Sequence, residues 1–284
     1  MAILKKAYTQ DFENIYPLLR ELNNTTLTKQ AWRELFKNYW NAPEDYFGYM
    51  LKDGNRVVGF LGFIFSHRMI NDTVHPFCNL TSLIVKENYR SESLNLIFEM
   101  LRLKEYTITV FTPALNTHTA LRKIGFEILE NYIRLIFPFQ MPFSRCDRYS
   151  IEFDKDAIKA SLNKAELDIY DDHARLNGFH LLLKSKTGYS YVIATKSKRK
   201  NFFFAHIHYI SNIDIFTKFI KYISFNICLR MGTLGLLVDE RYFKSKIPRG
   251  ILSARLPKIR LFKSSKLTRE EIDTLYSEFF ILNN

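Results

Sequence analysis

Cysteine is scarce in this sequence, and long apolar runs are absent. The chain has 3 cysteines, Cys78, Cys146 and Cys228, which are too few and too widely spaced for a disulfide framework or a zinc site. No segment approaches the ~20 apolar residues that span a bilayer. The N-terminal MAILKKAYTQDF contains no apolar core of a signal peptide. These absences predict a cytoplasmic protein with reduced thiols and no membrane span.

Acidic residues are also in short supply, chiefly in the second half of the chain. Residues 1–145 carry 17 Lys and Arg against 14 Asp and Glu, whereas residues 146–284 carry 24 against 15. Much of the excess lies in residues 196–200 and 241–269. It is compatible with a solubilising surface or with an anionic partner such as CoA, a nucleotide-sugar, RNA or an acidic glycan.

Apolar residues, in contrast, are abundant. They make up 47% of the chain, and 15% of the chain is aromatic, which excludes a disordered protein and allows large cores. The sequence Asp53-Gly54-Asn55 predicts a hairpin turn between two strands. Pro138, Pro142 and the polar SRCDR stretch after them predict a domain boundary near residues 141–150.

The second half repeats the element order of the first. Each half presents a hairpin, then a strand, a helix and a further strand, which indicates an internal duplication. We therefore predict two domains, residues 1–143 and 150–284. Each is expected to be of the α/β class, with a mixed, mostly antiparallel sheet flanked by helices.

The most informative stretch is Asn79 to Phe126. NLTSLIVK predicts a buried strand, SLNLIFEMLRL a helix, EYTITVF a second strand, and THTALRKIGF a short helix that Gly125 ends. A strand that runs directly into a helix leaves free backbone N–H groups and a positive dipole end, here expected at Arg90 to Asn95. Such a turn is suited to a pyrophosphate.

These residues resemble the core of the GNAT superfamily of acyl-CoA-dependent N-acyltransferases. In that family the turn after the strand is patterned Arg/Gln-x-x-Gly-x-Gly/Ala, and VKENYRSESLNL supplies Arg90 at the expected place. The glycine positions of the family fall here on Ser91, Ser93 and Asn95. The tyrosine that serves the family as acid for the leaving thiolate falls on Leu121.

The resemblance implies a set of CoA contacts and two tandem GNAT-like domains, the second divergent and basic. Backbone groups of the strand end would bind the pantetheine arm, and the turn would bind the pyrophosphate of acetyl-CoA or another acyl-CoA. The residues that fall on these positions are Leu83, Ile84, Val85, Arg90, Ser91, Glu92, Ser93, Leu94 and Asn95.

Histidines are the candidates for a general base. His206 and His208 alternate along one face of FFFAHIHYIS, and Asp172 and His173 lie near a predicted helix end. A carboxylate beside a histidine fixes its tautomer and raises its basicity. We expect His173 and His208 to act as base, with hydrogen-bonded core histidines as the competing interpretation. A third ligand with metal spacing is not visible, so no metal is expected.

The sequence thus predicts acyl transfer from an acyl-CoA to an amine, on an amino-sugar or another anionic small molecule. Two alternatives remain open. Duplication and basic charge would also suit a transferase that uses aminoacyl-tRNA, with nucleic acid as partner. The altered turn and the absent tyrosine would suit a non-catalytic binding or scaffold protein. Oligomeric state does not follow from the sequence.

Overall fold

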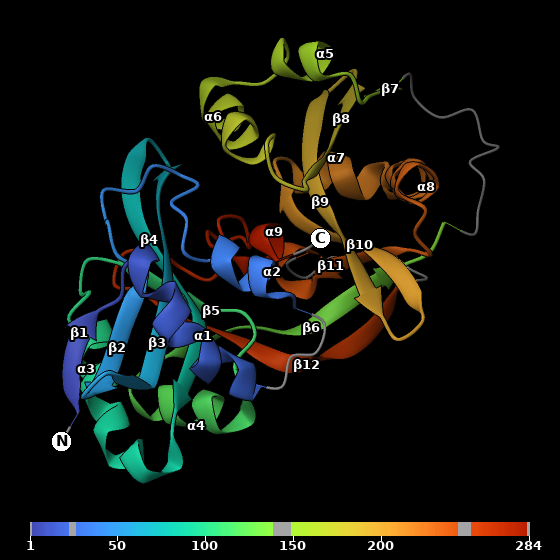
Figure 1. Cartoon of the computed structure of the whole chain (residues 1–284). Coiled ribbons are helices and arrows are strands. Elements are labelled where there is room, and N and C mark those ends of the chain that lie inside the picture. Colours follow the sequence, from blue (N-terminus) through green and yellow to red (C-terminus); the bar gives the residue numbers. More distant parts are fainter. Residues whose placement is uncertain (1, 23–26, 139–148, 244–250, 283–284) are drawn as a thin grey trace.

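The computed structural model describes residues 2–22, 27–138, 149–243 and 251–282. Within these ranges the strands form one twelve-stranded sheet (Figure 1). The strands of the first half of the chain are β1 (Ile3–Lys6), β2 (Gly48–Asp53), β3 (Arg56–Ile70), β4 (Thr73–Val85), β5 (Thr107–Val110) and β6 (Glu127–Ile136). Those of the second half are β7 (Tyr149–Glu152), β8 (Phe179–Ser185), β9 (Gly188–Arg199), β10 (Phe202–Ile210), β11 (Leu236–Asp239) and β12 (Leu252–Lys263).

The order of the strands shows an exchange between the halves. It runs β1-β2-β3-β4-β5-β12-β6-β11-β10-β9-β8-β7, so β12 completes the sheet of the first half and β6 that of the second. Two neighbouring pairs are parallel, β4 with β5 and β10 with β11. The other pairs are antiparallel. Residues of one half therefore border strands of the other at the centre of the sheet.

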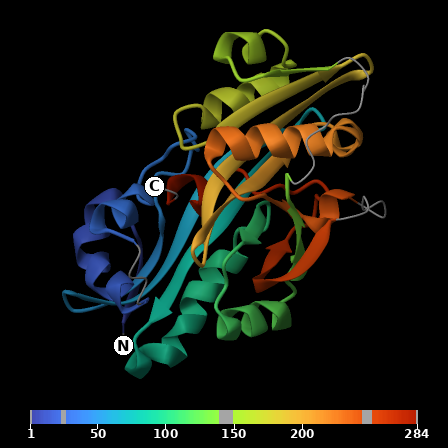
Figure 2. The ribbon, with the colours of Figure 1, turned by 90° about the vertical axis from the view of Figure 1, so that its right-hand side faces the viewer.

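Helices cover both faces of this sheet. They are α1 (Phe12–Leu19), α2 (Lys29–Glu34), α3 (Ser93–Leu101), α4 (Leu115–Lys123), α5 (Lys155–Lys159), α6 (Lys164–His173), α7 (Ile213–Lys218), α8 (Ile220–Met231) and α9 (Glu278–Ile281). Short 3-10 helices are η1 (Thr9–Asp11), η2 (Arg20–Leu22), η3 (Glu87–Glu92) and η4 (Glu240–Phe243). In Figure 2, α1 and α2 lie on one side of the first-half strands and α3 and α4 on the other.

The hydrophobic core is also divided between the two faces of the sheet, because side chains alternate along each strand. In β3, Phe60 and Ile64 pack with α1 and α2, whereas Leu61 and Phe63 pack with α3 and α4. Successive side chains of a strand point to opposite faces, so a strand buried on both sides supplies two cores. The core of α1 and α2 continues into the second half and includes Tyr191. The C-terminal segment around α9 also packs there, between the halves (Figure 1).

The predicted α/β class with a mixed, mostly antiparallel sheet and flanking helices is confirmed. The hairpin turn at Asp53-Gly54-Asn55 is also confirmed, with Gly54 at a φ of 57° between β2 and β3. The predicted boundary at residues 141–150 lies mostly outside the described residues, as does Cys146. Cys78 and Cys228 are buried free thiols. In the described part of the chain, no helix is long and apolar enough to cross a membrane.

Candidate active site

Strands β4 and β5 diverge in the middle of the first-half sheet. Their parallel pairing joins Phe77 to Thr107 and ends at Asn79 and Thr109, but β4 continues to Val85. Just past the last pair, β4 places two residues, Thr81 and Ser82, against the single residue Gly62 of β3. Such a bulge bends a strand and re-aims its side chains. Because β3 occupies only one edge of β4, the other edge presents backbone groups to the opening, which we call the β4/β5 fork.

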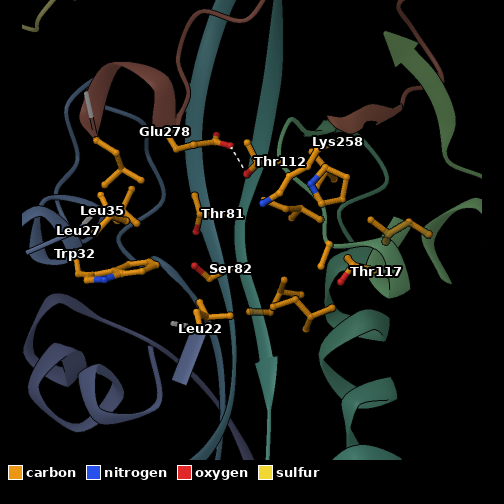
Figure 3. A pocket seen from close by; sticks show the side chains of 18 of the residues that line it. Leu22, Leu27, Trp32, Leu35, Thr81, Ser82, Thr112, Thr117, Lys258 and Glu278 are labelled. Carbon is orange, nitrogen blue, oxygen red and sulfur yellow. Dashed lines mark hydrogen bonds between the residues drawn. The ribbon is translucent and has the colours of Figure 1, made fainter. Parts of the chain in front are cut away.

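A cavity of about 280 Å³ occupies this fork. Its walls come from β4, the start of α4, α2 and the segment before it, and the C-terminal segment. Figure 3 shows Trp32 and Leu35 on one side, Thr112 and Thr117 on the other, and Glu278 at one end. Most of the lining is apolar, which is typical of a ligand site with a few placed polar groups.

Glu278 is the polar group with the most unusual surroundings. It is 5% exposed, and its Oε1 accepts a hydrogen bond from the Thr112 hydroxyl at 3.1 Å. Its Oε2 is buried and has no hydrogen-bond partner among the described residues. Burial raises the pKa of this carboxyl group to about 7, while the hydrogen bond from Thr112 and the nearby Lys258 charge act in the opposite direction. The carboxyl group can therefore gain or lose a proton near neutral pH.

The fold explains why Glu278 lies there. Ser277 caps α9 by accepting from the N–H of Phe279, and Phe280 and Ile281 anchor the segment in the core between the halves. The preceding residue Tyr276 has a φ of 54°, which turns the chain sharply before α9. These contacts fix Glu278 at the end of the cavity.

Strand β12 forms another wall of the site. Its pairing with β6 is irregular between Arg255 and Arg260, where Pro257 cannot donate to the ladder. Lys258 lies in this bulge and lines the fork cavity. Lys258 also lines a second cavity, of about 310 Å³, beside the fork cavity. A strand of the second half thus delivers a cation beside the first-half fork.

The strand residues of the predicted CoA site lie at the fork. Leu83 lines its cavity, whereas the side chains of Ile84 and Val85 pack against the two cores on either face of the sheet. Leu121, at the position of the family's tyrosine, is buried and also lines the cavity. The position therefore faces the fork but carries no acid.

The expected turn after β4 differs from the prediction. Residues Glu87–Glu92 are already helical, as η3, and α3 follows at Ser93 without a break. The N–H of Ser93 donates to the Arg90 carbonyl group, so it is not free. Glu92 accepts from the N–H of Ala2 at 2.9 Å. The side chains of Arg90, Ser91, Leu94 and Asn95 are exposed.

The predicted catalytic histidines lie in the interior. The rings of His206 and His208 are 4.3 Å apart, as expected for one face of a strand. His208 is fully buried, and its two ring nitrogens contact the hydroxyl groups of Thr195 at 2.8 Å and Thr274 at 2.7 Å. Burial holds its pKa well below the usual range. It has no free nitrogen to accept a proton from a ligand.

His173 is held in the same way. Its Nδ1 contacts the Ile169 carbonyl oxygen at 2.9 Å, and its Nε2 accepts from the N–H of Tyr276 at 3.4 Å. Burial lowers its pKa to about 3, which keeps the ring neutral. The ring packs edge-on against Tyr276 and Phe280. The structure thus favours the core interpretation of both histidines over a role as general base.

Glu278 carries no sequence signal that predicts a site. It lies 166 residues from Thr112 along the chain, in a segment with no motif. Its one local signal is the Ser277 cap before a short apolar run, which predicts a helix start and not a site. Among the described residues, no group of His, Cys, Asp or Glu is arranged to hold a metal ion.

Comparison with known proteins gives structural matches only. No protein-family model matches the sequence. No curated protein matches it significantly.

Three solved structures illustrate the likeness. The glucosamine N-acetyltransferase region of a fungal multi-domain β-N-acetylglucosaminidase matches at a TM-score of 0.62 and 13% identity, over 92% of this chain and 38% of that one. A probable N-acyltransferase from Enterococcus faecalis V583 matches at a TM-score of 0.60 and 13% identity, over 95% of this chain and 74% of that one. A GCN5-related N-acetyltransferase from Anabaena variabilis ATCC 29413 matches at a TM-score of 0.57 and 12% identity, over 92% of this chain and 72% of that one. The chain therefore has the fold of the GCN5-related N-acetyltransferases, the GNAT superfamily.

Proposed function

We propose that the protein binds an acyl-CoA, such as acetyl-CoA, at the β4/β5 fork and transfers its acyl group to the amine of a small molecule bound beside it. The observation that carries the proposal is Glu278, a buried carboxylate with one unpartnered oxygen at the end of a cavity between diverging strands. The GNAT fold of the chain supports it, as do the N-acyltransferase names of similar structures.

In this proposal Glu278 is the general base. The amine nitrogen attacks the thioester carbonyl carbon, an N–C bond forms, and the C–S bond breaks. The proton lost by the nitrogen passes to Glu278, which releases it to water, and the departing thiolate takes up one proton from water, so the products are an amide and free CoA. A base with a pKa near the working pH suits this transfer, and about 7 meets that condition.

The open edge of β4 would orient the acyl donor. We propose that backbone groups of Leu83, Ile84 and Val85 bind the pantetheine arm, because no strand pairs with this edge beyond Asn79 in the described residues. A backbone N–H at this edge would also polarise the thioester carbonyl group. The pyrophosphate would then lie near Arg90 to Asn95. The short helical start at η3 makes Arg90 the main candidate for a side-chain contact there.

We also propose that residues 1–143 and 150–284 are tandem GNAT-like copies. The strand order supports this, because each half contributes five strands to one side of the sheet and its last strand to the other side. Each half also contains one parallel pair, β4 with β5 and β10 with β11.

The test is Glu278→Gln, which keeps the size of the side chain and removes its basicity. With acetyl-CoA and a panel of primary amines, we expect kcat to fall ~10²-fold or more. The KM for acetyl-CoA should change less than about threefold, because the interaction lost belongs to the transition state. Glu270→Gln is the matched control, since Glu270 is an exposed glutamate of the same segment.

Equal turnover by the wild type and Glu278→Gln would overturn the base assignment. Absence of both turnover and CoA binding in the wild type would favour the scaffold alternative. An aminoacyl-tRNA donor would instead be indicated by RNA that stays bound at low salt and dissociates at high salt. The basic second half is the feature that supports this last alternative.

A further inference from the structure

The second cavity beside the fork is strongly cationic. Its volume is about 310 Å³, and it is lined by Phe111, Thr112, Ser197, Lys198, Arg199, His206, Leu256, Pro257, Lys258, Arg260 and Phe279. Four of these residues carry positive charge, and none is Asp or Glu. Three elements of the second half, β9, β10 and β12, supply all four cations and the histidine. The lining therefore selects for negative charge.

Among the described residues, Arg260 is the one of these four cations that pairs with a carboxylate. Arg260 is 2% exposed and donates to both oxygens of Asp239, at 2.7 and 2.6 Å. In the described part of the chain, no carboxylate pairs with Lys198, Arg199 or Lys258. Lys198, Arg199 and Lys258 are exposed residues, and the pKa of Arg199 is lowered by desolvation of its guanidinium group and by the charge of Arg260. This repulsion indicates a positive potential that a bound anion would relieve.

The cationic cavity adjoins the fork cavity, which contains the proposed catalytic group. Thr112 and Lys258 line both cavities, and Thr112 is the residue that donates to Glu278. Phe279, the next residue along α9, lines the cationic cavity, whereas Glu278 lines the fork. A ligand in the cationic cavity would therefore lie across Thr112 from the carboxylate.

We propose that this cavity is the acceptor subsite, and that the acceptor is a small amine that also carries a carboxylate or phosphate group. The acid group binds Lys198, Arg199 and Lys258, and the amine is thereby directed past Thr112 toward Glu278. Arg260 and His206 form a rigid floor, since both are buried and their side chains contact each other at 3.1 Å. This proposal rests on the proposed function, which it makes more specific.

The dimensions of the cavity favour a small acceptor over RNA. A volume of about 310 Å³ lies at the lower end of the range of small-molecule sites. Single-stranded nucleic acid needs a groove with several aromatic platforms along its length. The cavity offers Phe111 and Phe279, which stack on each other with ring centroids 5.7 Å apart. They are not arranged along a groove.

Three amines with the same two-carbon spacing provide the test. O-phosphoethanolamine, β-alanine and ethanolamine carry a phosphate, a carboxylate and a neutral hydroxyl group, respectively. Calorimetric titration of the full chain, without acyl donor, should give Kd values at least about tenfold lower for the two acidic amines. The acidic amine with the lower Kd identifies the anionic group that the cavity prefers. Equal affinity for all three would overturn the proposal.

Single substitutions test which residues cause the preference for acidic amines. Lys258→Met and Arg199→Gln should each weaken binding of the acidic amines about fivefold to tenfold and leave ethanolamine unchanged. Lys186→Met removes one exposed lysine at the β8–β9 turn and is the control for net charge. It should have no effect. If Lys258→Met and Arg199→Gln retain the preference for acidic amines, the acid group binds elsewhere and the proposal fails.

The two proposals fail in different ways. Acid preference in binding, with no turnover of any amine, would support this subsite and contradict the acyltransferase. Turnover of ethanolamine at the same kcat/KM as the acidic amines would support the acyltransferase and contradict this subsite. Glu278→Gln should retain the acid preference, since Glu278 contacts the amine end.

Discussion

Asp239 and Glu278 are two buried carboxylates of the same protein, and their environments shift their pKa values in opposite directions. Burial alone would raise the pKa of each. At Asp239 the charges of Arg260 and Arg241 outweigh burial, and the pKa lies well below the usual range. At Glu278 one hydroxyl group is the partner, and the pKa is raised to about 7. The partners of each carboxylate, and not its depth in the protein, therefore decide the direction of its pKa shift.

The two parallel strand pairs differ in a related way. The β4/β5 fork opens into a cavity. Beyond the β10/β11 pairing, which includes His206 and Leu237, Tyr242 donates to the His208 carbonyl oxygen at 2.8 Å. The ring of His208 contacts Phe279 and Phe280. Side chains of the protein itself thus fill the space beyond the β10/β11 pairing, whereas the β4/β5 fork holds the proposed site.

The substitution with the largest expected effect on the free energy of unfolding is at Asp239. Asp239→Asn would leave the buried Arg260 and Arg241 without a counter-charge, so we expect a loss of about 3–5 kcal/mol in the free energy of unfolding. Urea denaturation measures it. Glu240→Gln is the control, because its partner Arg134 forms a more exposed ion pair, and it should cost less than about 1 kcal/mol. A loss below that value in Asp239→Asn would mean that the network contributes little.

The contribution of Glu278 to the free energy of unfolding should depend on pH in the opposite direction from that of Asp239. Its folded pKa of about 7 exceeds the ordinary glutamate pKa of 4.5, so its stabilising contribution is present below pH 4.5 and lost as pH rises through 7. The wild type should therefore lose up to about 3 kcal/mol relative to Glu278→Gln between pH 5 and 8. The buried histidines titrate in both proteins and cancel in the difference. A difference that is independent of pH would place the carboxyl pKa outside this window.

His208 tests the structural role of the histidine cluster. His208→Ala removes two buried hydrogen bonds and leaves a cavity, so we expect a loss of about 2 kcal/mol in unfolding free energy. Turnover per folded molecule should stay within a few-fold of the wild type. A fall of about 10²-fold in turnover, with thermal melting unchanged, would restore His208 as a base.

The smallest expected effect is at Thr112. Thr112→Val removes the hydrogen bond that favours the ionised form of Glu278, so the carboxyl pKa should rise by about one unit or less. The rate–pH profile with acetyl-CoA should shift to higher pH by the same amount. Thr117→Val, which alters another threonine of the cavity wall, should leave the profile in place. A shift to lower pH in Thr112→Val would contradict the hydrogen-bond argument.

The fold was predictable because its signals are local. The strand–helix order of residues 79–126 reports on neighbouring residues, and the hairpin turn at Gly54 depends on one backbone conformation. The pairing of β12 with β5 and β6 was not predictable in this way. It joins residues that are between 117 and 155 positions apart in the chain, for which periodicity carries no information.

The site was only partly predictable for the same reason. The open strand end at Leu83 followed from the resemblance, but Glu278 reaches the fork by a long-range contact. The histidine pattern correctly predicted that His206 and His208 share a face of a strand. It could not predict that Phe279 and Phe280 cover that face, because burial depends on where the C-terminal segment packs.

The most direct test of the contrast between the two carboxylates is their titration by carbon-13 NMR. In protein labelled at the carboxyl carbons of Asp and Glu, one glutamate signal should titrate near pH 7 and be absent from Glu278→Gln. One aspartate signal, absent from Asp239→Asn, should show no titration down to the pH of acid unfolding. If every glutamate instead titrates below about pH 5.5, as exposed carboxyl groups do, Glu278 is not the base and the account is contradicted.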